Sequence, residues 1–253
     1  MGHAIRHTAQ DQIGRVRRRY GSAVQLLVLT SLVGFAYGLA TSPYFAVREV
    51  SVDAPDSGLA KQALANLHLP AGASTLLYPV QRLARGLERC PQIKRAVVER
   101  DLPGRLIVRV WRRQPVAAAQ SDGQWALLDE EGICVDTTAQ LPVSLIQCYG
   151  LTQGPPAVGQ RLAPEELELL SATLSGLRGQ PITRGLVMDF SDPYLIQIHS
   201  PTGVLGKLGT REDLERKLAL FVAIMQQLEE KEARPAYIDV RIMQRPVWQP
   251  RPR

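Results

Sequence analysis

The chain has 253 residues, of which 45% are hydrophobic, and its formal net charge is +6. A hydrophobic share of this size excludes a disordered polymer, and the length allows one large domain or two small ones. Most of the positive charge is local, because five arginines in residues 1–23 face only Asp11 and give an excess of +4. The remaining residues net about +2, which disfavours a nucleic-acid-binding role.

An uncharged apolar run, VQLLVLTSLVGFAYGLA, occupies residues 24–40. About 17 to 25 residues are needed to cross the hydrocarbon core of a bilayer, so we predict a transmembrane helix over residues 24–43. The basic cluster before it predicts a cytoplasmic N-terminus. The cluster consists of Arg15, Arg17, Arg18 and Arg19. The alternative is a cleaved secretory signal, because the basic start and the small-residue ending at Gly38 to Ala40 also fit that outline.

The three cysteines are Cys90, Cys134 and Cys148, an odd number that leaves at least one thiol free within a chain. A disulfide between Cys134 and Cys148 across neighbouring strands is one alternative. The other, which we favour, is that all three are small buried hydrophobic residues. No Cys-x-x-Cys pair is present and no histidine lies at metal-ligand spacing from them, so we predict no metal site.

Residues 44–113 predict a compact block with the order strand, helix, helix, strand, strand. The first strand covers residues 47–52, and Ser57 in the turn after it is a possible helix cap. Apolar residues at helical spacing predict helices within residues 59–69 and 80–89. Two strands, 93–101 and 105–111, supply the sheet that these short amphipathic helices need to cover.

Residues 114–248 predict a strand-rich second block. After a short strand at 115–119, a hairpin of strands 125–128 and 133–135 surrounds a turn that holds three consecutive acidic residues. We interpret Asp129, Glu130 and Glu131 as a solvated turn, against the alternatives of acid/base chemistry or a Ca²⁺ site. The elements expected after this hairpin are a helix from Pro164, strands at 186–190, 194–199 and 204–208, and a helix over 210–230. The apolar seam of that last helix favours covering its own sheet over dimerising as a coiled coil.

The final predicted strand covers residues 236–243 and is followed by the segment QRPVWQPRPR. A last strand often lies on a sheet edge, where unpaired backbone groups accept another protein's strand. Trp248 would then anchor the partner, because tryptophan is frequent in interface hot spots. Alternatively, the strand completes the sheet and Trp248 packs locally. The predicted partner-binding residues are Tyr237, Ile238, Val240, Arg241, Ile242, Met243, Val247 and Trp248.

The sequence contains no catalytic constellation. None of the four histidines belongs to a metal or nucleophile motif, and no Gly-x-Ser-x-Gly, phosphate-binding glycine loop or His-Glu-x-x-His is present. We therefore predict that the protein is not an enzyme and has no catalytic residues and no cofactor.

The complete order of these features resembles the FtsQ/DivIB family of bacterial cell-division proteins. The segments that carry the resemblance are FAVREVSV after the apolar run, CPQIKRAVVERDLPGRLIVRVWRRQPVA, WALLDEEGICVD, GVLGKLGTREDLERKLALF and the terminal YIDVRIMQRPVW. The resemblance spans nearly all of residues 15–248 and implies an α+β fold. Its expected parts are a basic cytoplasmic tail (1–23), a single transmembrane helix (24–43), a β-α-α-β-β POTRA domain (44–113), an FtsQ-type β domain with covering helices (114–248) and a C-terminal tail (249–253).

The resemblance also implies a function. Members of the family are single-pass scaffolds of the divisome in the plasma (inner) membrane at the division septum, where they link early and late division proteins and help regulate septal peptidoglycan synthesis. The implied partners are FtsB-like and FtsL-like bitopic proteins, with the FtsB-like protein at the last strand. Ile242 and Met243 depart from the family, in which an aromatic residue is common there. The alternative functions are a POTRA-bearing factor for envelope assembly or secretion, and a membrane-anchored cell-wall enzyme.

Overall fold

The computed structural model describes residues 24–179 and 185–251, so the predicted basic tail with Arg15, Arg17, Arg18 and Arg19 lies outside the described residues. The chain divides into two compact units. The first contains the chain up to Asp53 together with Leu67–Ala84 and Val97–Arg109. The second contains Ala54–Asn66, Arg85–Ala96 and the chain from Val110 onward. Helices and sheets coexist throughout, and the predicted α+β class is confirmed.

Residues 24–40 form a helix, which is followed by a short 3₁₀ turn, η1 (Pro43–Phe45). The hydroxyl of Ser42 accepts a hydrogen bond from the N–H of Tyr44 (3.3 Å), and proline at the first position suits a helix start, so a new element begins here. Within the part of the chain that the structure describes, no helix has both the length and the hydrophobicity needed to cross a membrane. The predicted transmembrane segment 24–43 is therefore not confirmed.

The next five elements follow the predicted order strand, helix, helix, strand, strand. They are β1 (Glu49–Asp53), α2 (Ser57–Ala65), α3 (Val80–Leu87), β2 (Ile93–Asp101) and β3 (Arg105–Arg112). The strands form a sheet in the order β1-β3-β2, with β1 parallel to β3. The cap of α2 is Asp56 and not the predicted Ser57, because the Asp56 carboxylate accepts a hydrogen bond from the N–H of Leu59 (2.9 Å).

The turn between β2 and β3 holds the start of β1. Gly104 has a φ of +81°, and a Cβ at this position would lie 2.9 Å from the carbonyl oxygen of Ala46. Its own carbonyl accepts a hydrogen bond from the N–H of Arg48 (2.7 Å). Only glycine combines this backbone conformation with so close an approach, so Gly104 fixes where β1 begins to pair with β3.

A second sheet has nine strands in the order β12-β11-β10-β9-β8-β7-β4-β5-β6. The elements that build it and cover it are β4 (Ala117–Ser121), β5 (Gln124–Leu128), β6 (Cys134–Thr138), β7 (Ile146–Tyr149), α4 (Pro164–Gly176), β8 (Val187–Asp189), β9 (Ile196–His199), β10 (Leu205–Gly209), α5 (Leu214–Glu230), β11 (Pro235–Asp239) and β12 (Val247–Pro250). Most neighbours pair antiparallel, but β7 pairs parallel with both β4 and β8. Strand β7 was not predicted, although it joins the two halves of the sheet.

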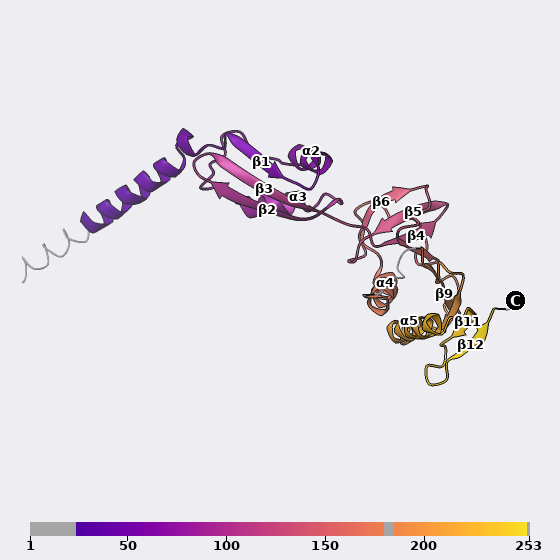
Figure 1. The fold of residues 1–253 in the computed structure, drawn as a ribbon. Helices are drawn as coiled ribbons and strands as arrows, with labels where there is room; N and C mark the ends of the chain where they lie inside the picture. Colours follow the sequence, from indigo (N-terminus) through magenta and orange to yellow (C-terminus); the bar gives the residue numbers. More distant parts are fainter. Residues whose placement is uncertain (1–23, 180–184, 252–253) are drawn as a thin grey trace, which may run out of the picture. The chain divides into compact units, whose positions relative to one another are not determined.

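Helices α4 and α5 lie side by side and contribute to the core of this sheet (Figure 1). The predicted apolar seam of α5 is buried in that core, which confirms that it covers its own sheet. The seam residues are Leu214, Leu218, Phe221, Met225 and Leu228. The residue before α5, Asp213, adopts a left-handed conformation and its side chain makes no cap hydrogen bond.

Two glycines allow the helices and the sheet to approach closely. A Cβ on Gly206 of β10 would lie 2.7 Å from the ring of Phe221, which places α5 directly over this strand. A Cβ on Gly176 at the end of α4 would lie 2.7 Å from both the carbonyl oxygen of Glu215 and the Cβ of Leu218 on α5. The absence of side chains at these two positions therefore sets how closely α5 packs on its neighbours.

We expect Gly176→Ala to destabilise the folded chain by about 1 to 3 kcal/mol, since the added methyl overpacks the contact between α4 and α5. The matched control is Gly86→Ala in α3, where nothing lies within 4 Å of the added Cβ. Alanine favours a helix by about 1 kcal/mol over glycine, so the control should stabilise or leave stability unchanged. Urea unfolding of the full chain measures both variants. Equal effects of the two substitutions would contradict the packing argument.

Candidate functional site

The nine-stranded sheet ends at β12, which pairs antiparallel with β11, while β11 pairs parallel with β10. The predicted final strand 236–243 is wrong in its second half, because β11 ends at Asp239 and a separate strand follows. The carboxylate of Asp239 accepts a hydrogen bond from the N–H of Arg241 (3.1 Å). Such a local bond competes with strand pairing and favours a turn. The edge strand is therefore β12 and not β11.

The outward edge of β12 offers few backbone donors. Arg251 donates its N–H to the carbonyl of the residue that precedes β11 (2.9 Å). Since backbone groups of alternate residues in an antiparallel strand turn to the same side, Gln249 and Val247 also face β11. Trp248 and Pro250 consequently turn their backbone groups away from β11. Because proline has no N–H, Trp248 is the one residue of β12 that presents a donor at this edge.

The eight predicted partner-binding residues do not form one surface. Ile238 and Val240 are 0% exposed and belong to the core, so their side chains are not accessible to a partner. Val247 and Trp248 on β12 are 55% and 42% exposed, and Ile242 in the loop before β12 is 63% exposed. Among the predicted residues, these three therefore present most of the accessible apolar surface.

The other three predicted residues are engaged or only partly accessible. Tyr237 is partly buried, with the ammonium of Lys207 4.4 Å from its ring centroid. The guanidinium of Arg241 contacts both carboxylate oxygens of Asp239, at 2.6 to 3.0 Å. Met243 is partly exposed in the loop between β11 and β12. A contact between these side chains and a partner would therefore compete with, or add to, existing contacts inside the domain.

The pair between Asp239 and Arg241 stabilises the turn that leads to β12. The hydrogen bond from the Arg241 side chain, followed by that from the Arg241 N–H, holds the pKa of Asp239 below its usual value of 3.8, although partial burial acts in the opposite direction. The same pairing raises the pKa of Arg241. Because the folded pKa of Asp239 is depressed, its stabilising contribution is present above pH 3.8 and is lost as the pH falls through the folded value.

We expect Asp239→Asn to be less stable than the unsubstituted chain at pH 7, with the difference narrowing as the pH is lowered below about 3.8, the usual value for this group. Urea unfolding between pH 7 and pH 2 measures the difference. Arg241→Met should reduce the same acid dependence, because it removes the main cause of the shift. Parallel stability profiles of Asp239→Asn and the unsubstituted chain would contradict the assignment.

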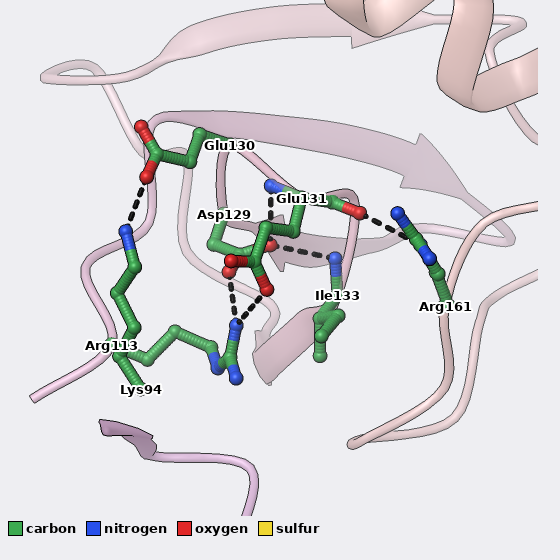
Figure 2. Close-up of polar contacts among 7 residues, drawn as sticks. All are labelled: Lys94, Arg113, Asp129, Glu130, Glu131, Ile133 and Arg161. Atoms are coloured by element: carbon green, nitrogen blue, oxygen red, sulfur yellow. Dashed lines mark hydrogen bonds and ion pairs between the residues drawn. The ribbon is translucent and has the colours of Figure 1, made fainter.

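A second polar arrangement lies in the turn between β5 and β6 (Figure 2). Asp129 is 1% exposed, and its Oδ1 accepts hydrogen bonds from the N–H groups of Glu131 (3.0 Å) and Ile133 (2.7 Å). Its Oδ2 pairs with the guanidinium of Arg113, which is 6% exposed and also contacts Glu131 at 3.1 Å. The predicted solvated turn is therefore wrong for Asp129. It is correct for Glu130 and Glu131, whose side chains are exposed.

The charges in this turn differ in how they are compensated. Burial acts to lower the pKa of Arg113, but its hydrogen bonds to Asp129 and Glu131 outweigh burial and raise that pKa. The exposed pair of Lys94 and Glu130 raises the pKa of Lys94 through its hydrogen bond. A surface pair of this kind contributes little to stability, whereas removing one partner of a buried pair leaves an uncompensated charge. The pair of Arg113 and Asp129 is therefore the one on which the turn depends.

We expect Asp129→Ala to destabilise the chain by about 3 to 5 kcal/mol, because Arg113 would remain buried without its main counter-charge. The neighbouring variant Glu130→Ala is the matched control and should cost less than about 1 kcal/mol. Urea unfolding followed by tryptophan fluorescence measures both, since Trp125 on strand β5 is buried and packs edge to face against Tyr149. A loss from Glu130→Ala as large as that from Asp129→Ala would contradict this ranking.

In the described ranges 24–179 and 185–251, no group of side chains is arranged for metal or thiol chemistry. There, no three or more His, Cys, Asp or Glu side chains are arranged to hold a metal ion. Cys134 on β6 and Cys148 on β7 are free, with β5 and β4 between their strands. Three strand spacings separate them by roughly 14 Å, while a disulfide needs Cα atoms within about 7 Å, so the predicted alternative of a bond between them is wrong. Burial raises the pKa of the Cys148 thiol to about 12.

Besides strands β7 and β12, a buried arginine and a cavity of the second unit were not predicted from the sequence. The buried role of Arg113 has no local signal, because it ends a run of basic residues that look alike in sequence. A cavity beside α4, lined in part by Glu165, Tyr194 and Glu212, was also missed. The only local sign was Asp192-Pro193, between the strands predicted at 186–190 and 194–199, which is equally typical of a simple turn.

These observations define the class of the protein. It is an α+β protein with a nine-stranded sheet, two helices packed in its core and an edge strand, β12, with an exposed tryptophan. Residues 117–241 match the sequence model of the family described as "Cell division protein FtsQ/DivIB, C-terminal". The match begins at the first residue of β4 and ends before β12.

Curated relatives agree with this match. The "Cell division protein DivIB" of Clostridium acetobutylicum is 22% identical over 211 residues, which cover 81% of this chain and 83% of the relative. The protein of the same description from Clostridium botulinum is 20% identical over 212 residues, covering 81% and 82%. The segment 117–241 therefore belongs to the FtsQ/DivIB family of cell division proteins, and the two relatives extend the similarity to 81% of the chain, as the resemblance predicted.

Proposed function

We propose that this chain is a non-enzymatic scaffold of the bacterial divisome. In this role it links early and late division proteins and helps regulate septal peptidoglycan synthesis by holding other proteins at the septum. The observation that carries the proposal is the exposed edge of β12, where Trp248 and Val247 are accessible beside unpaired backbone groups. An open edge of this kind is a template for another protein's strand.

A partner strand on β12 would depend on side chains more than on a backbone ladder. Trp248 supplies the single outward N–H of the strand, because Pro250 has none. The ring of Trp248 lies on the same face as the buried Ile238, its register partner on β11. We assign this edge to an FtsB-like bitopic partner and place an FtsL-like protein in the same assembly. Trp248 is then the anchor and Val247 and Ile242 are flanking contacts.

Membrane anchoring through residues 24–43 is part of the proposal. Every side chain of residues 24–39 is exposed, and none of them is charged. An apolar helix without protein cover is stable in an apolar surrounding such as a bilayer. The basic residues Arg15, Arg17, Arg18 and Arg19 would keep the N-terminus cytoplasmic and leave the C-terminus outside. Confinement to the membrane raises the effective concentration of the scaffold toward other membrane proteins.

We also propose that residues 44–113 form a POTRA domain and residues 114–248 an FtsQ-type β domain. The order of β1, α2, α3, β2 and β3 supports the first assignment. Few residues separate the helix from its first contact with the rest of this unit, because the N–H of Thr75 already donates to the carbonyl of Phe45 (2.7 Å). This short connection suits a domain that is held close to its membrane anchor.

We expect Trp248→Ala to weaken binding of a purified FtsB-like partner at least about tenfold, the equivalent of 1.4 kcal/mol, because hot-spot tryptophans carry at least this much. Calorimetric titration of the full chain measures the effect. The matched control is Trp111→Ala, which removes a tryptophan of similar exposure (45%) on β3 and should leave the affinity unchanged. Unchanged affinity of Trp248→Ala would remove β12 from the proposal. A charged substitution at Val240 would be unsuitable as a test, since Val240 is buried.

A fluorescent fusion at the N-terminus, expressed at native level, tests the cellular role. We expect a band at the constriction site that fails to form when division is blocked upstream. Uniform fluorescence around the envelope through the whole cell cycle would contradict the divisome role.

A further inference from the structure

A groove in the second unit is separate from the β12 edge and has no assigned role. It has a volume of about 450 Å³ and lies between the start of α4, the loop after β7 and the turn between β8 and β9. Its lining includes the apolar side chains of Leu151, Phe190 and Ile196, which are 3%, 6% and 2% exposed. A volume of this size is typical of sites that hold a small ligand or a few side chains. We call it the α4 groove.

Close backbone contacts define the wall of the α4 groove. Gly150 has a φ of +66°, and a Cβ there would lie 2.5 Å from the backbone nitrogen of Ser191, so the loop after β7 is packed against the β8–β9 turn. In that turn, the carboxylate of Asp192 accepts a hydrogen bond from the N–H of Tyr194 (2.9 Å) and its carbonyl one from Leu195 (3.0 Å). The Tyr194 side chain is 79% exposed at the rim. The groove is thus preformed, with a large aromatic side chain left in solvent.

The rim of the α4 groove is acidic. Glu165, Glu166 and Glu212 contribute three carboxylates, against the single guanidinium of Arg211. Glu166 accepts a hydrogen bond from the N–H of Ala163 at the start of α4 (2.9 Å). Glu165 and Glu212 are exposed, and among the ion pairs of residues 24–179 and 185–251 neither carboxylate takes part. Their charge is therefore available to a ligand.

We propose that the α4 groove binds a peptide segment of another protein that carries a Lys or Arg next to a large apolar side chain. The apolar floor gives the apolar side chain a site out of water. The carboxylates of Glu165 and Glu212 pair with the cation, and the ring of Tyr194 adds a cation–π contact. The same acidic rim repels anionic ligands such as nucleic acid or phosphorylated compounds. The groove shares no residue with β12, so this inference holds whether or not β12 binds a partner.

The test uses fluorescently labelled heptapeptides of the form Gly-Leu-Lys-Phe-Lys-Leu-Gly, in a panel that varies the position and type of the basic residue. Each peptide has a counterpart with Glu in place of the basic residues. Fluorescence anisotropy with the purified full chain measures the affinity, and the same buffer and detergent without protein give the background. We expect saturable binding of at least one basic peptide, weakened by salt, and none of its acidic counterpart.

Charge reversal then locates the binding. In Glu165→Lys/Glu212→Lys we expect the basic peptide to bind at least about tenfold more weakly and the acidic counterpart to gain affinity. The matched control is Glu168→Lys, which makes the same charge change at an exposed position of α4 outside the groove lining. Tyr194→Ala should weaken binding of the basic peptide and should not allow the acidic counterpart to bind. Circular dichroism shows that each variant is folded.

Three outcomes would overturn the inference. The first is no saturable binding of any basic peptide up to about 1 mM. The second is equal weakening by Glu168→Lys and by Glu165→Lys/Glu212→Lys, which would assign the effect to net charge. The third is self-association of the full chain that the double variant abolishes, which would make a second copy of this chain the occupant. Trp248→Ala should leave peptide binding unchanged, so failure here is distinguishable from failure at β12.

Discussion

The packing of α5 on the nine-stranded sheet is the contact on which the candidate docking surfaces depend. Phe221 lies over β10 at Gly206, where any side chain on the strand would collide with its ring. β11 pairs with β10 and β12 pairs only with β11, so the edge strand is held two strands away from this contact. Gly176 likewise allows α4 and α5 to pack closely, because a side chain there would collide with Glu215 and Leu218. The start of α4, and with it the groove beside it, is positioned by that helix pair.

The charged side chains of this chain fall into two groups: those whose ion pairs stabilise the fold, and those that remain available to a ligand. Arg113 and Asp129 form a buried ion pair that stabilises the β5–β6 turn. Arg241 is committed to Asp239 at the end of β11 although it is half exposed. By contrast, Glu165 and Glu212 remain solvated and unengaged by the ion pairs of the described residues. The site proposed at the α4 groove therefore uses carboxylates that lack an ion-pair partner among the described residues, and pairing, with or without burial, distinguishes the two kinds of charge.

Elements with a strong internal period were predictable from the sequence, and those defined by long-range pairing were not. The seam of α5 and the alternation in β3 identify these two elements, because apolar residues recur on one face of each. Strand β7 has four residues and sits among parallel neighbours, so no alternation marks it. The final strand was extended through Ile242 because its apolar alternation continues there, while the turn is made by a carboxylate and a backbone N–H two residues apart. The burial of Asp129 depends on Arg113, which is sixteen positions away in the chain and invisible to any local pattern.

The prolines around Trp248 have a consequence for how crowded copies of this protein behave. Two identical edge strands that pair gain stability from a regular series of backbone hydrogen bonds, and each missing N–H donor removes one of these bonds. Pro246 precedes β12 and Pro250 ends it, and neither has an N–H to give. A second β12 would therefore find one donor per strand and two bulky indole rings to accommodate. The edge can stay open when copies are crowded together without joining them into fibres, which leaves it free for a strand whose side chains fit the ring of Trp248.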